Sequence, residues 1–514
     1  MSCFLGIDSG TSGVKALILD GEGVVRSIGY KECDVLNPEP GFAEQDPMDW
    51  WRACSGAVKE AVAKSGCGME IEGIGFSGQM QGTVLLDKDK KPVGNSLIWL
   101  DQRATEEVEE IQKIITAEES MKVTTNYCLN SFWAPKLMWL KKHRPADFER
   151  ADKVVFTKDF LRLMMTGEVS TEVSDASLSY LMDVPGRCWS EKMLKALDIP
   201  RELMPDRLCE SQDVCGYLLE SVAKEWGMKP GIPVVAGAGD QPACGVGTGI
   251  VRNGVVGSSI GTSGVIFASF DKPFLLDKEC ATYGMCHAVP GLWGFLGLTL
   301  TSGASFKWVR DTFFAEKKAQ FAAEGKDIYD YMTNMAAQAA VGSEGLCFLP
   351  YLNGEKTPIN DENARGTFFG LSQRHGMNEI CRSVMEGVTF SLRDSVEMFR
   401  AAGLEVNEIR ASGGGAKSQL WRQIQADIYN ANVVTMNMEE GPAAGAAILG
   451  AVGAGYFKNV AEGCDAVLKI ESVTEPIAEN VKIYNDYYKT YRDLYANLKS
   501  TFAQQAAIVK KYTK

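Results

Sequence analysis

The chain has 514 residues, which is too long for one ordinary hydrophobic core and therefore predicts two large domains. Hydrophobic residues make up 45% and charged residues 23%, the balance of a soluble globular protein. The formal net charge of −13 disfavours nucleic acid or an anionic membrane surface as the main partner.

Targeting and cysteine patterns point to a cytoplasmic protein. Asp8 stands where a signal peptide would be apolar, and no apolar run is long enough to span a bilayer. The 14 cysteines include no CxxC pair, and the closest spacings, Cys209 with Cys215 and Cys280 with Cys286, match no zinc pattern. We expect these thiols to be reduced.

The first predicted elements form a repeat. Gly10-Thr11-Ser12-Gly13-Val14 recurs as Gly261-Thr262-Ser263-Gly264-Val265, and Asp20 and Asp271 share the same offset. Each copy lies between two apolar runs, so each is predicted as a strand, a turn and a strand. We interpret the repeat as a domain duplication; two unrelated glycine-rich hairpins are the alternative.

A duplicated domain implies two similar lobes that face each other across a cleft. A turn rich in glycine, threonine and serine exposes N–H groups and hydroxyls, which bind phosphate oxygens. The copies differ at Asp8, whose counterpart is Ser259. A carboxylate beside phosphates needs a cation, so Asp8 is a candidate for organising Mg²⁺, directly or through water. Its other possible role is to cap the turn.

Further along the chain we expect helices at 50–64 and 105–119 and strands at 24–30, 71–76 and 232–236. Glycines 73, 75 and 78 match GxGxxG by letter, but the chain continues into a second strand and not into a helix, so a dinucleotide site is rejected. No P-loop GxxxxGK[ST] sequence is present.

Asp240 ends the strand that precedes it, after Gly237-Ala238-Gly239. Small neighbours let a ligand approach this carboxylate closely. It lies just before the inferred lobe junction, near residues 245–254, and could accept a proton from a substrate hydroxyl. The alternative, a helix cap before Gln241-Pro242-Ala243, is compatible with that role.

In the second half we expect a turn, Ser412-Gly413-Gly414-Gly415, between a strand at 408–411 and a helix at 417–430. Helix N-termini attract anions, and three glycines permit close approach to a phosphate or a flat ring. A tight strand–helix turn without a ligand is the alternative. We also expect helices at 378–402 and 441–454, and a packing role for a stripe of tyrosines at 484, 487, 488, 491 and 495.

Several of these segments resemble, in order, the motifs of the FGGY carbohydrate kinases, a branch of the actin/hexokinase/Hsp70-like ATPases. The similarity is greatest to the xylulokinases of that family. It is carried by residues 6–15, 77–82, 99–103, 134–139, 237–240, 261–264, 366–387 and 412–418.

The resemblance implies an α/β fold with two ribonuclease H-like lobes around a central cleft. The N-terminal lobe, residues 1–249, would bind sugar and phosphate, and the C-terminal lobe, residues 250–514, would bind the nucleotide and end in a helical tail. It also implies ATP and Mg²⁺ as cofactors, Asp240 as the catalytic base and Asp8 beside the metal.

The same resemblance implies two sets of binding residues. Those for the sugar are Met80, Gln81, Trp99, Asp101, Arg103, Asp240 and Gln241. Those for ATP are Gly10, Thr11, Ser12, Lys15, Gly261, Thr262, Gly303, Lys307, Gly413, Gly414, Gly415 and Ser418.

Three residues depart from the xylulokinase pattern: Gln81 stands where histidine is usual, Gln241 where asparagine is common, and Trp133 where a small residue is usual. These departures bear on the sugar and not on phosphoryl transfer. We therefore expect an ATP-dependent kinase that converts a ketopentose, D-xylulose, to D-xylulose 5-phosphate.

Alternatives within the class are kinases of another ketose or a polyol, such as ribulose or erythritol. Alternatives outside it are a non-catalytic sugar sensor on the same fold and an actin- or Hsp70-like ATPase with a protein partner. We expect a small-molecule sugar as partner, with no nucleic acid and no membrane, and leave a homodimer open.

Overall fold

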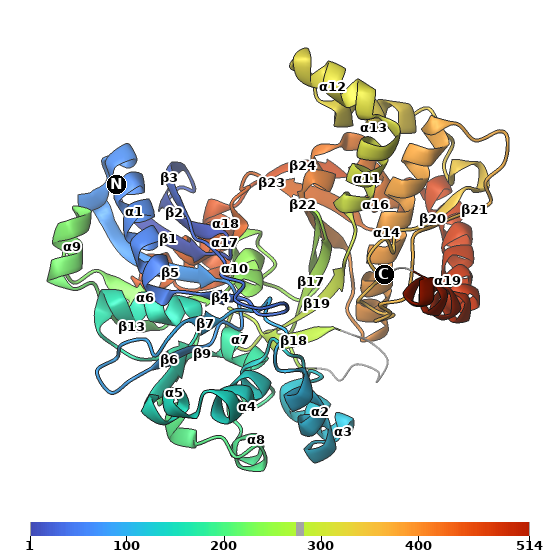
Figure 1. The fold of residues 1–514 in the computed structure, drawn as a ribbon. Coiled ribbons are helices and arrows are strands. Elements are labelled where there is room, and N and C mark those ends of the chain that lie inside the picture. The colour runs from blue at the N-terminus through green and yellow to red at the C-terminus, as the bar shows by residue number, and fades with distance from the viewer. Residues whose placement is uncertain (1, 274–281, 513–514) are drawn as a thin grey trace.

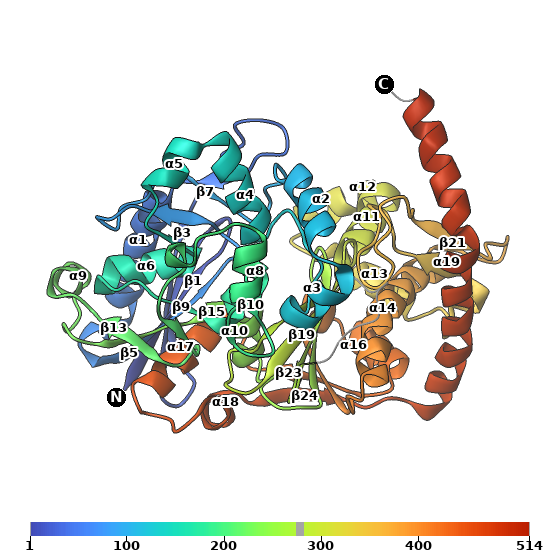
Figure 2. The same cartoon turned by 90° about the horizontal axis from the view of Figure 1, so that it is seen from below.

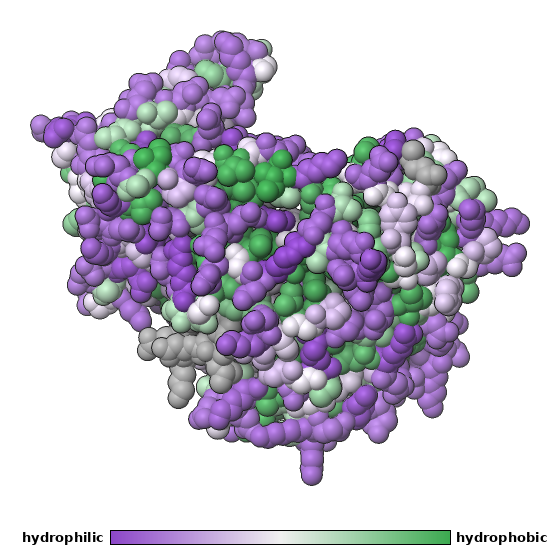
Figure 3. All heavy atoms as spheres, turned by 180° about the vertical axis from the view of Figure 1, so that it is seen from behind, coloured by the Kyte–Doolittle hydropathy of each residue, from purple (hydrophilic) through white to green (hydrophobic). Residues whose placement is uncertain are grey.

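The computed structural model describes residues 2–273 and 282–512, so Cys280 lies outside the described residues. The chain forms two lobes, each built on a mixed β-sheet covered by helices (Figure 1). Among the described residues, none of the helices combines the length and the apolar character needed to cross a membrane. Figure 3 shows hydrophilic side chains over most of one face of the molecule.

The first sheet has the strand order β13-β14-β5-β1-β2-β3, and β15 also pairs with β5. At its centre β1 (Cys3–Ser9) and β2 (Gly13–Asp20) form an antiparallel hairpin, and β5 (Ile71–Gly78) runs parallel to β1. The outer strands are β3 (Val25–Glu32), β13 (Val214–Tyr217), β14 (Pro233–Val235) and β15 (Ala238–Gly239).

The second sheet repeats this arrangement, in the order β18-β19-β17-β16-β22-β23-β24. Here β16 (Val255–Ile260) and β17 (Gly264–Phe270) form the hairpin, and β22 (Glu408–Gly413) runs parallel to β16. The predicted strand–turn–strand is confirmed at both copies, and the shared pairing is what a duplication produces. The outer strands are β18 (Tyr283–Cys286), β19 (Trp293–Thr299), β23 (Asn432–Met436) and β24 (Ile470–Thr474).

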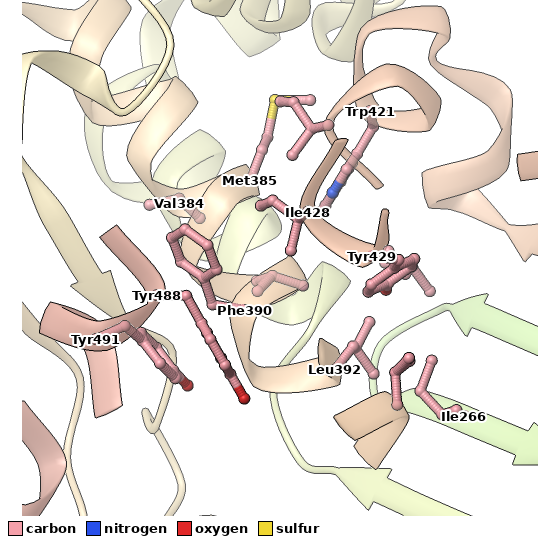
Figure 4. Packing of buried hydrophobic residues seen from close by; sticks show 14 of the residues in the cluster. Ile266, Val384, Met385, Phe390, Leu392, Trp421, Ile428, Tyr429, Tyr488 and Tyr491 are labelled. Carbon is pink, nitrogen blue, oxygen red and sulfur yellow. The ribbon is translucent and has the colours of Figure 1, made fainter. Parts of the chain in front are cut away.

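The core of the second lobe lies between α14 (Met377–Ala401), α16 (Gln419–Tyr429) and α19 (Ala478–Tyr512). Tyr488 and Tyr491 of α19 pack on Phe390 with ring centroids 5.9 and 5.5 Å apart (Figure 4). The predicted packing role of the tyrosine stripe is confirmed. The far end of α19 projects beyond the lobe (Figure 2).

Helix α17 (Gly441–Gly453) belongs to the second half of the sequence but packs on β1 and β5 of the first sheet, where Figure 1 shows it among the blue strands. A side chain at Gly6, Gly73 or Gly75 would overlap the backbone of this helix. These glycines therefore permit close helix–sheet contact, which agrees with the rejection of a dinucleotide motif.

One predicted helix was wrong in extent. The segment 105–119 is split into α2 (Thr105–Ile114) and α3 (Ala117–Thr124). Thr116 is extended, and its side chain accepts a hydrogen bond from the Glu119 N–H, so it caps a new helix where the pattern predicted continuation.

The remaining α-helices connect or cover the two sheets. In the first lobe they are α1 (Pro47–Ser65), α4 (Trp133–His143), α5 (Pro145–Arg150), α6 (Thr157–Thr166), α7 (Val173–Ala176), α8 (Glu191–Ala196), α9 (Glu220–Trp226) and α10 (Asp240–Gly247). In the second half of the chain they are α11 (Gly303–Phe313), α12 (Ala315–Ala323), α13 (Ile328–Ala336), α15 (Gly414–Lys417) and α18 (Val460–Val467).

Candidate active site

Asp240 is the first residue of α10 and directly follows β15. Because Gly239 pairs with Gly78 at the end of β5, Asp240 lies beside the segment that leaves β5. A side chain on Gly239 would come within 2.7 Å of Met80 Cγ. The structure therefore brings Met80, a predicted sugar contact, against the backbone next to Asp240.

Asp8 and Asp240 are both half-buried, and the charge of Asp8 acts on Asp240. Burial raises the pKa of Asp240 to about 7, the negative charge of Asp8 adds to this, and hydrogen bonds from Gln241 oppose it. Burial also raises the pKa of Asp8, opposed by the Ser77 hydroxyl, which donates to Asp8 Oδ1 at 2.8 Å, and by Lys15. Such a pair favours a proton or a cation between the carboxylates.

The two predicted phosphate-binding turns, residues 10–13 and 261–264, are called the phosphate-type turns. Side chains of the first one bind residues in or next to the predicted sugar site. Thr11 Oγ1 donates to Gln79 Oε1 at 3.3 Å and accepts a hydrogen bond from Trp99 Nε1 at 2.8 Å. The Trp99 side chain is 45% exposed. Trp99 therefore lies against the turn that contains Gly10, Thr11 and Ser12, with a free face for a ligand.

Two more predicted ATP contacts, Ser12 in this turn and Lys15 on β2, interact with other parts of the protein. Lys15 of β2 forms an ion pair with Glu440, the residue that precedes α17. The Ser12 carbonyl accepts a hydrogen bond from the Tyr30 hydroxyl at 3.1 Å. Lys15 thus links the first sheet to the segment that returns from the second half of the chain.

Gln81 follows β5 and is nearly buried, with 7% of its surface exposed. Its φ of 69° is the left-handed region that side chains rarely adopt. Its N–H donates to Asp175 Oδ1 at 3.2 Å and its carbonyl accepts from Lys136 Nζ at 2.9 Å. Lys136 lies in the segment 134–139 that carries the family resemblance, but neither Lys136 nor Asp175 was predicted as a site residue.

Asp101 and Arg103 lie inside the first lobe and pair with each other, while Arg103 Nη1 is buried without a hydrogen-bond partner among the described residues. Arg103 Nε donates to both Asp101 carboxylate oxygens at 2.9 Å, and Arg103 Nη2 lies 2.8 Å from Glu44 Oε1. The guanidinium stacks 3.8 Å from the centroid of the Phe42 ring. The structure buries these two predicted sugar contacts within the first lobe and does not bring their charged atoms to a solvent-exposed surface.

Gln241 lies at the junction of the two lobes. It lines a cavity of about 30 Å³ together with Ser259 of β16 and Ser412 of β22. Ser259 is the counterpart of Asp8, and it pairs with Ser412 as Asp8 pairs with Ser77. The two equivalent strand ends thus flank the start of α10 from opposite lobes.

A larger cavity of about 580 Å³ opens in the second lobe, between the end of β16, the start of α11 and the end of β22. It gathers eight residues predicted for ATP: Gly261, Thr262, Gly303, Lys307, Gly413, Gly414, Gly415 and Ser418. The cavity is also lined by residues that were not predicted: Asp327, Tyr329, Asp330 and Thr333 on or beside α13, with Phe306 and Trp421. These residues follow an ordinary helical pattern, so no local signal marks them.

The actin/hexokinase/Hsp70-type phosphotransferases share three features with this structure. They have two lobes with the same sheet core, a phosphate-type turn in each lobe, and carboxylates at the junction of the lobes. A family model of the FGGY carbohydrate kinase N-terminal domain matches residues 3–247, and one of the C-terminal domain matches residues 256–454. The chain therefore belongs to the FGGY family of carbohydrate kinases. The predicted family and fold class are confirmed, and as an FGGY member the chain uses ATP as phosphate donor.

Similar proteins cover nearly the whole chain. The xylulose kinase of Escherichia coli K12 is 37% identical over 96% of this chain and 99% of its own length. A ligand-bound xylulose kinase of Lactobacillus acidophilus matches with a TM-score of 0.89 at 26% identity, covering 98% of this chain and all of its own. A gluconate kinase from the same organism matches with the same TM-score at 25% identity, covering 98% of this chain and 99% of its own. The fold alone therefore does not determine the sugar.

Proposed function

We propose that this protein transfers the γ-phosphate of ATP to D-xylulose, with D-xylulose 5-phosphate and ADP as products. The observation that carries the chemistry is the half-buried Asp240 at the start of α10, flanked by Asp8 and by the Met80–Gln81 segment. The choice of sugar is supported by the 37% identity to a xylulose kinase over nearly the full length.

In the proposed mechanism the terminal hydroxyl of the sugar gives its proton to the Asp240 carboxylate and its oxygen attacks the γ-phosphorus in line with the leaving ADP. The raised pKa of Asp240, about 7, makes it a stronger base than an exposed aspartate. The two phosphate-type turns offer N–H groups to the transferring phosphate. Closure of the lobes would exclude water as a competing acceptor.

Asp8 fits the role of a Mg²⁺ ligand, directly or through water. Its carboxylate lies where a second carboxylate, Asp240, is close enough to be influenced by its charge, so a cation is favourable there. Mg²⁺ is usually bound by one or two carboxylates together with substrate phosphates, a donor set that this site can provide. When bound, the ion neutralises charge on the phosphates.

We assign the remaining residues as follows. Met80, Gln81, Trp99 and Gln241 would contact the sugar, and Asp101 with Arg103 would support the wall of its site. The cavity of about 580 Å³ would hold the nucleotide, and residues 10–15 would face its phosphates. The lobes would be 1–249 and 250–514, with α17 returning to the first. We also propose a cytoplasmic location, which suits the free thiols of the described cysteines, and a homodimer as the assembly to test.

A coupled assay of ADP release tests this function directly. The protein is incubated with Mg·ATP and, in separate reactions, D-xylulose, D-ribulose, L-ribulose, erythritol and gluconate. We expect the highest kcat/KM with D-xylulose. Strong ADP release with another sugar alone would reassign the substrate, and sugar-independent ADP release would favour an ATPase with a protein partner. Binding without turnover would favour a sensor.

A further inference from the structure

Gln81 is held by side chains on both of its backbone polar atoms. Its N–H donates to Asp175 Oδ1 at 3.2 Å, and its carbonyl oxygen accepts from Lys136 Nζ at 2.9 Å. A glutamine at a φ of 69° is unfavourable by itself, so it persists only where its surroundings enforce it. Two hydrogen bonds from buried side chains to one residue provide that enforcement.

Both partners are completely buried, each with an exposure of 0%. Lys136 lies on α4, and its ammonium also donates to the Leu97 carbonyl at 3.1 Å. On the same helix Trp133 Nε1 donates to the Gly82 carbonyl at 2.8 Å. Burying an ammonium group has a high free-energy cost, so its use to fix the backbone at 81 and 97 indicates a demand for position at that point.

Asp175 is itself immobilised by a buried cluster of charges. Lys158 Nζ lies 3.0 Å from Asp159 Oδ1, 3.1 Å from Glu172 Oε1 and 3.3 Å from Asp175 Oδ2, and Arg162 pairs with Asp159 at 2.9 Å. Burial raises the pKa of Asp175 to about 8. At neutral pH Asp175 therefore carries a proton. The cluster then contains two cations, two carboxylates and one neutral carboxyl group, so its net charge is zero.

The short helix α7 that carries Asp175 reaches the catalytic segment as well. Ser174 Oγ accepts a hydrogen bond from the N–H of Gly239, the residue before Asp240, at 3.1 Å. The same hydroxyl donates to Glu172 Oε1 at 2.9 Å. Adjacent residues of α7 thus fix Gln81 on one side and the start of α10 on the other, which sets the distance between them.

We propose that Asp175 and Lys136 are positioning residues that hold Gln81 in its left-handed conformation and thereby determine which ketose the site accepts. The proposal rests on the proposed function, in which the Gln81 side chain contacts the sugar. Because both side chains are completely buried, each would act on the sugar through Gln81. Substitution should therefore change the sugar parameters while the ATP parameters stay nearly constant.

The first experiment compares Asp175→Ala with Asp175→Asn in the full-length protein. Alanine removes the acceptor of the Gln81 N–H, so we expect KM for D-xylulose to rise about tenfold and the ranking of D-xylulose, D-ribulose and L-ribulose to change, with KM for ATP within about twofold. Asparagine keeps a side-chain oxygen and should restore values within about threefold of wild type.

Asp159→Asn is the matched control, because Asp159 is 1% exposed and belongs to the same cluster but makes no hydrogen bond to Gln81 among the contacts of the described chain. We expect it to lower Tm and to keep the ranking of sugars. If Asp175→Ala also keeps the ranking, or if both variants change sugar and ATP parameters alike, the positioning role is overturned.

A second set of variants leaves the buried charge cluster around Lys158 unchanged. Lys136→Met removes the donor to the Gln81 carbonyl, and we expect the same change in sugar ranking. This variant keeps the proposal testable if Asp175→Ala does not fold. In a Gln81→Gly background, where glycine adopts a positive φ freely, adding Lys136→Met should change KM for the sugar less than about twofold. Full additivity would overturn the proposal. A wild-type protein inactive with every sugar would instead contradict the proposed function.

Discussion

The two lobes contain the same hairpin and parallel strand but differ in how their turns are fixed. In the first lobe the Cys33 N–H donates to the Ser12 carbonyl at 3.0 Å, and side chains add to this backbone bond, since Thr11 binds Gln79 and Trp99. In the second lobe backbone bonds fix the turn, since the N–H of Gly303 donates to the Gly261 carbonyl at 2.8 Å. Side-chain anchoring ties the first turn to the sugar side, whereas backbone anchoring leaves the second turn open to a large cavity.

One pair of equivalent positions sharpens this contrast. Asp8 lies opposite Ser77 on the parallel strand of the first lobe, and Ser259 lies opposite Ser412 in the second. The two lobes thus present the same scaffold, and a carboxylate occupies one of the two matching positions. We infer that the first lobe contributes the carboxylate beside the phosphates and that the second contributes the cavity for the nucleotide.

The largest effect is expected for Asp240→Asn, which removes the proposed base from the first-lobe side of the junction. General-base removal typically lowers kcat by about 10²–10⁴-fold. Steady-state kinetics and calorimetric titration of ATP and sugar measure it. Binding should persist, and a kcat near that of the wild type would refute the role of Asp240.

Asp8→Ser gives β1 the residue that β16 has at the equivalent position, Ser259. The variant therefore removes the difference between the two lobes at this position. We expect kcat to fall on the order of 10- to 100-fold and the Mg²⁺ concentration for half-maximal rate to rise, with little change in sugar binding. A Mg²⁺ titration at fixed ATP measures this. An unchanged Mg²⁺ dependence would leave Asp8 as a turn cap.

Gly303→Ala tests the second lobe. A side chain here would overlap the Gly261 carbonyl and displace the turn, so KM for ATP should rise about tenfold while KM for the sugar stays nearly constant. Gly376→Ala is the control, since the contact nearest to an added carbon there is a flexible carboxylate at 3.6 Å. Equal effects on KM for ATP and KM for the sugar would contradict the assignment of the second lobe to nucleotide binding alone.

The pH profile tests the charge assigned to the first lobe. Asp240 must be unprotonated to accept a proton, and its pKa is raised to about 7 by burial and by Asp8. Therefore kcat/KM for the sugar should rise with pH up to about 7 and then level, falling about tenfold per unit below it. Rates measured from about pH 5 to about pH 9 check this. A flat profile would mean that no such group controls turnover.

The smallest effect is expected for Gln81→His, which changes the sugar side without touching either phosphate-type turn. We expect the ratio of kcat/KM for D-xylulose to that for D-ribulose to shift about three- to tenfold, with ATP affinity nearly unchanged. Kinetics with three pentuloses on both proteins measure it. If the ratio is constant, Gln81 does not select the sugar.

Local signals predicted the parts of the fold that depend on neighbouring residues. The two hairpins follow from apolar runs around Gly-Thr-Ser-Gly, and the strand end before Asp240 follows from Gly237 to Gly239. Long-range contacts escaped prediction. No pattern near Asp101 and Arg103 shows that they are buried against Glu44, and none near Asp327 shows that it lines the large cavity. The contacts of Lys136 with Gln81 join residues 55 positions apart.

Helix α17 has a consequence for how the chain acquires its structure during synthesis. It covers β1 and β5, yet it is made after both lobes' hairpins, because it begins at Gly441. Until the ribosome has passed that point, one apolar face of the first sheet lacks its cover, and exposed strands of this kind are prone to associate. We therefore expect the first lobe to complete its fold only after α17 is made, and a fragment ending between the lobes to be aggregation-prone.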